Sequence, residues 1–192
     1  MPMTDMLSST LMITFLFIAV STILRAMNAK PPIIRLEDTK DYRFQTGSFT
    51  VNTRFTDALM KKAIPKIENT IRCFGIDTIE IIGHTDGRPG ATGGNVDTTI
   101  SDAFRTKDMS QVIAGSNMDL GFLRAMAVQN KIENVLSSKG IDNLGFIVLS
   151  AGSTIDPKGN FSPAENKDEK SRRRIEIRFV RRSKTPFIPK CT

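Results

Sequence analysis

The chain has 192 residues, with 27 lysines and arginines against 20 aspartates and glutamates, so its formal net charge is +7. The excess lies mostly in "KSRRRIEIRFVRRSK" near the C-terminus, a pattern that suits nucleic acid, anionic lipid, another acidic polymer or simply a solvated face. With no tryptophan and one tyrosine, the chain has few platforms on which nucleic-acid bases could stack. Two cysteines without a CxxC motif argue against a structural zinc site, and whether Cys73 and Cys191 form a disulfide stays open.

The first element in chain order is an uncharged stretch at residues 6–24, "MLSSTLMITFLFIAVSTIL". As a helix it spans roughly 28 Å, about the thickness of the bilayer hydrocarbon. No basic region precedes it and "RAMNAK" is a poor cleavage site, so the pattern favours an uncleaved transmembrane helix over a secretory signal peptide. Arg25 and Lys30 follow the stretch, and the positive-inside rule alone would place that side in the cytoplasm.

Asp5 stands at the start of this helix, with Ser8 and Ser9 on the same helical face and Thr10 and Thr14 nearby. One interpretation is an ordinary helix start, because the helix dipole favours an acid there. The other is an ion or proton site that faces another subunit. The residues alone leave both open.

Residues 1–26 are predicted to be a short cytoplasmic tail and the transmembrane helix, followed by a linker at 27–41 and a domain at 42–192 with an insertion at about 90–115. The Pro-Pro pair and the following charges indicate the linker. Periodicity and turn residues predict an α+β domain in the order β-α-β-α-β-β, with a mixed sheet and helices on one face. The predicted elements are a strand at 42–52, a helix at 53–72 that Pro65 kinks, a strand at 77–83, a short helix near 98–106, a helix at 118–138, and strands at 143–152 and 173–180.

The strand at 77–83 runs into "IEIIGHTDGRPG", which holds the only histidine, His84, and an acid, Asp86. A metal site needs three or four protein ligands, and one histidine with scattered carboxylates does not supply them. A hydrolytic triad would have to use the same histidine. The sequence therefore predicts no metal, no cofactor and no enzyme, and we expect His84 to pack or to hydrogen bond at the turn.

Together, the segments "IEIIGHTDGRPG", "NMDLGFLRAMAV", "GSTIDPKGNFSPAEN" and "SRRRIEIRF" resemble the OmpA-like (OmpA/MotB) peptidoglycan-binding domain over residues 42–182. The resemblance implies an OmpA-like sandwich that grips the diaminopimelate of the peptidoglycan stem peptide. Asp86 and Arg124 would supply the opposite charges, because Asp complements an ammonium and Arg a carboxylate. Thr85 and Asn117 occupy positions of the same motif. Arg173 or Arg174 would join the anion-binding side.

The segment "TDMLSSTLMITFLF" resembles the membrane helix of MotB-type stator subunits and, more loosely, of ExbD and TolR. This resemblance implies that Asp5 carries H⁺ or Na⁺ with Ser9 nearby, and that two copies, a homodimer, sit inside a pentameric multi-span MotA/ZorA-like membrane subunit. It also implies an inner-membrane protein with its C-terminal domain in the periplasm, where no nucleic acid is expected. The short tail and linker are most similar to the B subunit of Zorya anti-phage systems. A flagellar stator subunit and a passive peptidoglycan tether without ion flux are the alternatives.

Overall fold

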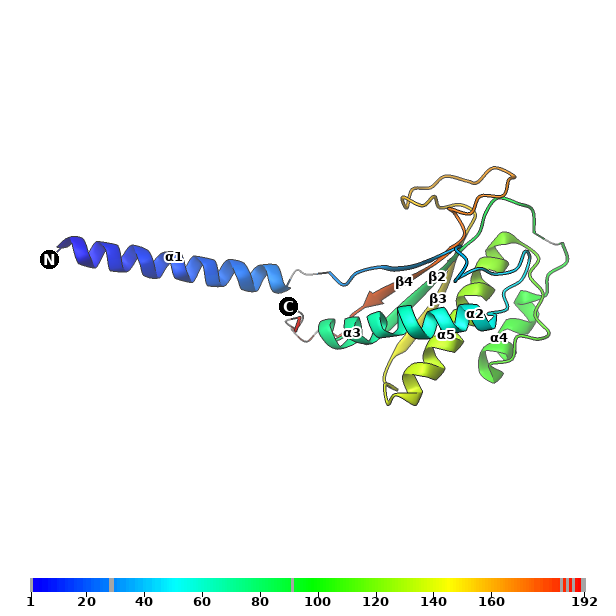
Figure 1. The fold of residues 1–192 in the computed structure, drawn as a ribbon, viewed down its shortest axis with the longest axis horizontal. Helices are drawn as coiled ribbons and strands as arrows, with labels where there is room; N and C mark the ends of the chain where they lie inside the picture. The colour runs from blue at the N-terminus through cyan, green and yellow to red at the C-terminus, as the bar shows by residue number, and fades with distance from the viewer. Residues whose placement is uncertain are drawn as a thin grey trace.

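The computed structural model describes residues 2–27, 30–90, 92–183, 185, 187 and 189–190, and leaves the side chains of residues 2–5 and 25–27 outside the description. Helix α1 (Pro2–Met27) extends away from the rest of the molecule (Figure 1). Its stretch Met6–Leu24 has a mean hydropathy of 2.1, and none of it is buried against the rest of the chain. By length and composition, it is the one helix of the described residues that could cross a membrane.

After α1 the chain forms a mixed four-stranded sheet with helices. The elements are β1 (Ile34–Glu37), α2 (Thr53–Ala58), the π-helical turn η1 (Leu59–Ala63), α3 (Ile64–Phe74), β2 (Thr78–His84), α4 (Val96–Thr106), α5 (Asn117–Ser138), β3 (Gly145–Gly152) and β4 (Arg174–Val180). The strand order is β1-β4-β2-β3, with β2 and β3 parallel and the other two pairs antiparallel. The α+β class and the mixed sheet are as predicted from the sequence.

One main core lies between the sheet and helices α3 and α5, which run across its front in Figure 1. The isoleucines of β2 alternate so that Ile79 and Ile81 are fully buried there, as period-two strand geometry requires. From α5, Val128 and Ile132 are also fully buried. The helices therefore hold β2 at the centre of the sheet, and the site described below begins where β2 ends.

The first strand is not where the sequence predicted it. Residues 42–52 form no strand, and β1 lies instead within the segment predicted as a linker, pairing with β4. The aromatic rings of Tyr42 and Phe44 contact the ring of Phe55, with centroids 5.3 and 5.0 Å away. Apolar side chains that pack onto a helix from an extended coil produce the same alternation as a strand, which explains the wrong prediction.

The helix predicted at 53–72 is present without a break, but its hydrogen-bonding pattern changes from α in α2 to π in η1 and back to α in α3. Pro65 lies in the first turn of α3, directly after η1, and because it has no N–H to continue the helical hydrogen bonds, the change of winding occurs next to it. The insertion does contain the short helix predicted near 98–106. That helix, α4, packs on α5 through a second, smaller core that includes Ala103, Val112, Leu123 and Met126.

Candidate functional site

Asp86 lies two residues beyond the end of β2 and is only 5% exposed. Its Oδ2 accepts hydrogen bonds from Arg88 Nε, at 3.0 Å, and from Arg173 Nη1. Its Oδ1 receives no hydrogen bond from the residues that the structure describes. One oxygen of this carboxylate is thus held by the protein, and the other is available to a ligand cation.

Arg173, just before β4, joins three carboxylates from separate parts of the chain. Its Nε lies 2.6 Å from Asp38 Oδ2, and its Nη1 also donates to Asp86 and Asp168. Burial alone would lower the pKa of this guanidinium, but the hydrogen bonds with the three carboxylates outweigh that effect and raise it. Arg173 is therefore a fixed cation that orients Asp86.

Arg124 reaches the same place from α5 and is 4% exposed. Its Nε donates to the carbonyl of Ser48 at 2.9 Å, and its Nη2 donates to the carbonyl of Gln45 at 3.2 Å. The guanidinium carbon also lies 5.0 Å from the centre of the Phe44 ring. Burial, and next the nearby charge of Arg173, lower the pKa of Arg124 to about 10. It stays charged at neutral pH, held by neutral partners rather than by a paired carboxylate.

Two glycines set the separation between the strand that carries Asp86 and the helix that carries Arg124. A Cβ built on Gly83 would lie 1.8 Å from the carbonyl oxygen of Gly121, and a Cβ on Gly121 would lie 3.0 Å from that of Gly83. Any side chain at either position would push α5 away from β2. Gly121 lies one helical turn before Arg124, so this close contact positions the arginine.

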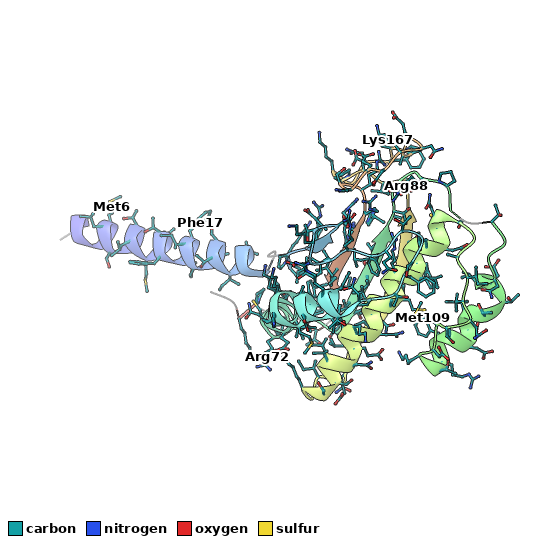
Figure 2. The ribbon with its side chains drawn as sticks, turned by 45° about the vertical axis from the view of Figure 1, so that its right-hand side comes forward. Met6, Phe17, Arg72, Arg88, Met109 and Lys167 are labelled. Atoms are coloured by element: carbon teal, nitrogen blue, oxygen red, sulfur yellow. The ribbon has the colours of Figure 1, made fainter. Side chains whose placement is uncertain are left out.

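The side chains of Asp86, Arg88, Arg124 and Arg173 line one cleft at the end of the sheet. Asn117, the first residue of α5, also lines it and donates through Nδ2 to the carbonyl of Arg88 at 2.8 Å. In Figure 2, Arg88 and Lys167 lie at the same end of the domain, and Arg88 is 3.8 Å from Asp168 in the loop that carries Lys167. The cleft is therefore framed by the turn after β2, the start of α5 and the loop between β3 and β4.

Thr85 is placed differently from the other predicted ligand-binding residues. It is 1% exposed, its N–H donates to the carbonyl of Gly152 at 2.8 Å, and its hydroxyl has no hydrogen-bond partner within the described chain. It does not line the cleft. Its predicted part in ligand binding stays a prediction.

His84 and Arg174 belong to a buried cluster behind the cleft. Arg174 Nε donates to Glu176 Oε1 at 3.0 Å, and His84 Nε2 lies 3.8 Å from that oxygen. Burial, with repulsion from Arg174, lowers the pKa of His84 to about 4, so its ring is neutral at physiological pH. Of the two arginines considered for the anion-binding side, Arg173 therefore lies in the cleft and Arg174 holds Glu176.

The structure brings four of the predicted site residues, Asp86, Asn117, Arg124 and Arg173, to one cleft. The predicted ion-carrying residues, Asp5 and Ser9, lie in the separate helix α1, and the side chain of Asp5 is outside the description. No group of three or more potential metal ligands occurs among the described residues.

Three residues of the site were missed from the sequence: Arg88, which lines the cleft, and Asp38 and Asp168, which hold Arg173. Arg88 stands inside the quoted motif, two positions after Asp86, and could have been considered there. Asp38 and Asp168 carried no local signal, because each reaches the cleft only through the fold.

No family model matches the chain, and no curated protein matches it. Among solved structures, the chain is similar to the periplasmic domain of Helicobacter pylori MotB in two crystal structures. One is 18% identical over 80% of this chain and 85% of that chain, with a TM-score of 0.47. The other is 20% identical over 80% and 78%, with a TM-score of 0.45. It is also similar to the cell wall anchor of the T6SS from Pseudomonas aeruginosa, at 18% identity over 78% and 81%, with a TM-score of 0.43.

Proposed function

We propose that the chain anchors a membrane complex to peptidoglycan. The observation that carries the proposal is the convergence of an acid, Asp86, and a base, Arg124, from different elements into one cleft. The diaminopimelate of a stem peptide presents an ammonium and a carboxylate on one small centre. Two fixed groups of opposite charge complement such a zwitterion.

In this proposal each cleft residue has its own part. The ligand ammonium binds Asp86 Oδ1, the oxygen that the described residues leave without a hydrogen bond. The ligand carboxylate binds Arg124, whose protein partners are neutral carbonyls, together with Arg88, whose side chain is 36% exposed. Arg173 already holds three carboxylates and orients Asp86.

The test is binding of the purified full chain to isolated sacculi. Asp86→Asn keeps the shape of the side chain and removes its charge, and Arg88→Ala removes a half-exposed cation. Because a hydrogen bond to a charged group contributes about 1.5–3 kcal/mol, each variant is expected to weaken binding by roughly 10- to 150-fold. Arg105→Ala is the matched control, since Arg105 is exposed on α4 and pairs with Asp102. Wild-type binding by both cleft variants would refute the peptidoglycan proposal.

We further propose that α1 spans the inner membrane, with the domain in the periplasm, and that the complex is an ion-driven stator. The apolar surface of Met6–Leu24 is not buried by its own chain, so lipid or the helices of other subunits must cover it. A homodimer inside a multi-span MotA/ZorA-like subunit would provide such a cover. Asp5 would carry the ion, with Ser9 on the same helical face.

The finer assignment is to Zorya-type anti-phage defence, supported by the short connection between α1 and β1, which leaves no room for a long plug segment. Asp5→Asn should abolish protection against phage, or ion-dependent activity of the reconstituted complex, while sacculus binding is retained. Ser21→Ala, near the other end of α1, is the control for a change within the helix. Retained activity in Asp5→Asn together with sacculus binding would establish the passive tether instead.

A further inference from the structure

One end of the sheet lies close to α1, and the other end, which carries the cleft, lies far from it. Strand β1 begins at Ile34, opposite Ile177, and runs antiparallel to β4. The chain therefore leaves α1 and enters the sheet from the side where β4 ends at Val180 and β2 begins at Thr78, which are paired. The cleft lies where β2 ends and β4 begins, so it is at the far end of the sheet from α1. Figure 1 shows the same arrangement, with α1 and the C-terminal segment on one side.

The connection between α1 and the sheet is short. Only residues 28–33 separate Met27 from Ile34, so even a fully extended chain spans about 25 Å between these two residues. Ile34 pairs with Ile177, and β4 continues for three more residues to Val180. About 10 Å of the connection therefore runs beside β4 before it passes the end of the sheet. The near end of the domain therefore lies within about 15 Å of the end of α1.

This near end carries exposed basic side chains. Arg72 lies in the last turn of α3, and Arg182 and Lys190 lie in the segment after β4; all three are exposed. The half-buried Arg181 stacks over the Phe187 ring at 5.1 Å. Arg72 is labelled in Figure 2 on the side of the domain nearest α1, away from Lys167.

Three described residues after β4, Arg182, Ser183 and Lys190, hydrogen bond to the body of the domain. Asp77 accepts backbone hydrogen bonds from Arg182 at 2.9 Å and from Ser183 at 2.9 Å, which lower the pKa of its carboxyl group. The N–H of Lys190 donates to the carbonyl of Cys73 at 2.9 Å, and Cys73 takes part in a disulfide. Asp77 is thus occupied with backbone amides and does not pair with the basic side chains next to it, although the exposed Asp142, just before β3, also lies at this end.

We propose that this basic end, defined by Arg72, Arg181, Arg182 and Lys190, binds the anionic headgroups of the membrane that α1 crosses. The short connection lets this end come to within about 8 Å of the bilayer surface, the distance over which charges still attract at physiological salt. The contact holds the domain upright, with the cleft facing away from the membrane. This inference rests on the proposed membrane insertion of α1 and is independent of peptidoglycan binding.

The test is hydrogen–deuterium exchange of the full chain in nanodiscs of phosphatidylcholine, with and without a quarter of phosphatidylglycerol. Amides of residues 72–77 and 181–183 should exchange on the order of tenfold more slowly in the anionic discs. The effect should disappear at 1 M salt and in the triple variant Arg72→Gln/Arg182→Gln/Lys190→Gln. The matched control is Lys158→Gln/Lys167→Gln/Lys170→Gln, which removes the same charge from the exposed loop at the cleft end and should keep the protection.

Equal exchange in both discs, or protection that survives the triple variant, would overturn the proposal. So would protection of residues 86–90 in place of the near end, because the cleft would then face the lipid. Protection by inorganic phosphate in the absence of anionic lipid would exclude a membrane contact. A chain that inserts into neither disc would overturn the membrane proposal as well, whereas loss of sacculus binding alone would leave the lipid contact standing.

Discussion

Replacing Gly121 with Ala tests whether the contact between α5 and β2 builds the cleft. The new Cβ would lie 2.5 Å from Ser150 Oγ and 3.0 Å from the carbonyl oxygen of Gly83. Ser150 cannot easily move, because its Oγ donates to the carbonyl of Met118 at 2.7 Å and accepts from the N–H of Gly152 at 3.1 Å. Overpacking of this kind costs about 1–3 kcal/mol, and the better helix propensity of Ala returns up to about 1 kcal/mol. We expect a net loss of about 1–2 kcal/mol in the free energy of unfolding.

Two other glycines calibrate this expectation. Gly83→Ala would place its Cβ 1.8 Å from a backbone oxygen that belongs to a buried helix, so its cost should be clearly larger. Gly145→Ala should be nearly neutral, because its Cβ would make an ordinary contact with Thr78 Oγ1 at 3.4 Å. Urea unfolding of the full chain in detergent, followed by circular dichroism, measures all three. If Gly121→Ala unfolds at the same urea concentration as Gly145→Ala, the inferred close packing is wrong.

The remaining predictions concern buried groups outside the cleft. The folded chain keeps His84 neutral, whereas the unfolded chain protonates it near pH 6.5, so stability present above pH 6.5 should fall by up to about 3 kcal/mol as the pH drops toward 4. In His84→Gln, the urea midpoint should change less between pH 7 and pH 5 than it does in the wild type. The lowered pKa of Glu176 affects stability only below this pH range. A variant with the same pH dependence as the wild type would contradict the prediction. Cys73→Ser removes a disulfide and should cost about 2–4 kcal/mol, measured by urea unfolding with and without reductant. Reductant that leaves the wild type unchanged would argue against it.

The elements with strong local periodicity were predictable. The isoleucine-rich strand β2 and the amphipathic helix α5 lie within a residue or two of the predicted ranges, because their patterns reflect the core that they bury. The edge strand β1 was missed. It has four residues beside a Pro-Pro pair, and it is a strand only because it pairs with β4, which lies about 140 residues further along the chain.

The residues of the candidate site that belong to a sequence motif could be predicted. The contacts between residues that are distant in the sequence could not. Asp86 and Arg124 could be named from their motifs. The role of Arg173 could not, because it depends on Asp38, 135 residues earlier, and on Asp168 in an irregular loop. Their positions follow from pairing of β1 with β4 and from the path of the loop before β4. Neither has a local sequence pattern.

The balance of charge in the cleft decides which ligands suit it. Arginines 88, 124 and 173 stand beside the carboxylates of Asp38, Asp86 and Asp168, and Arg43 also pairs with Asp38. The cluster therefore carries charges of both signs, and a ligand with only negative charge would meet Asp86 unfavourably. A zwitterionic group can pair with Asp86 through its ammonium and with Arg124 through its carboxylate without changing the total charge. The cleft thus favours an amino-acid-like centre over a phosphate or a nucleic acid.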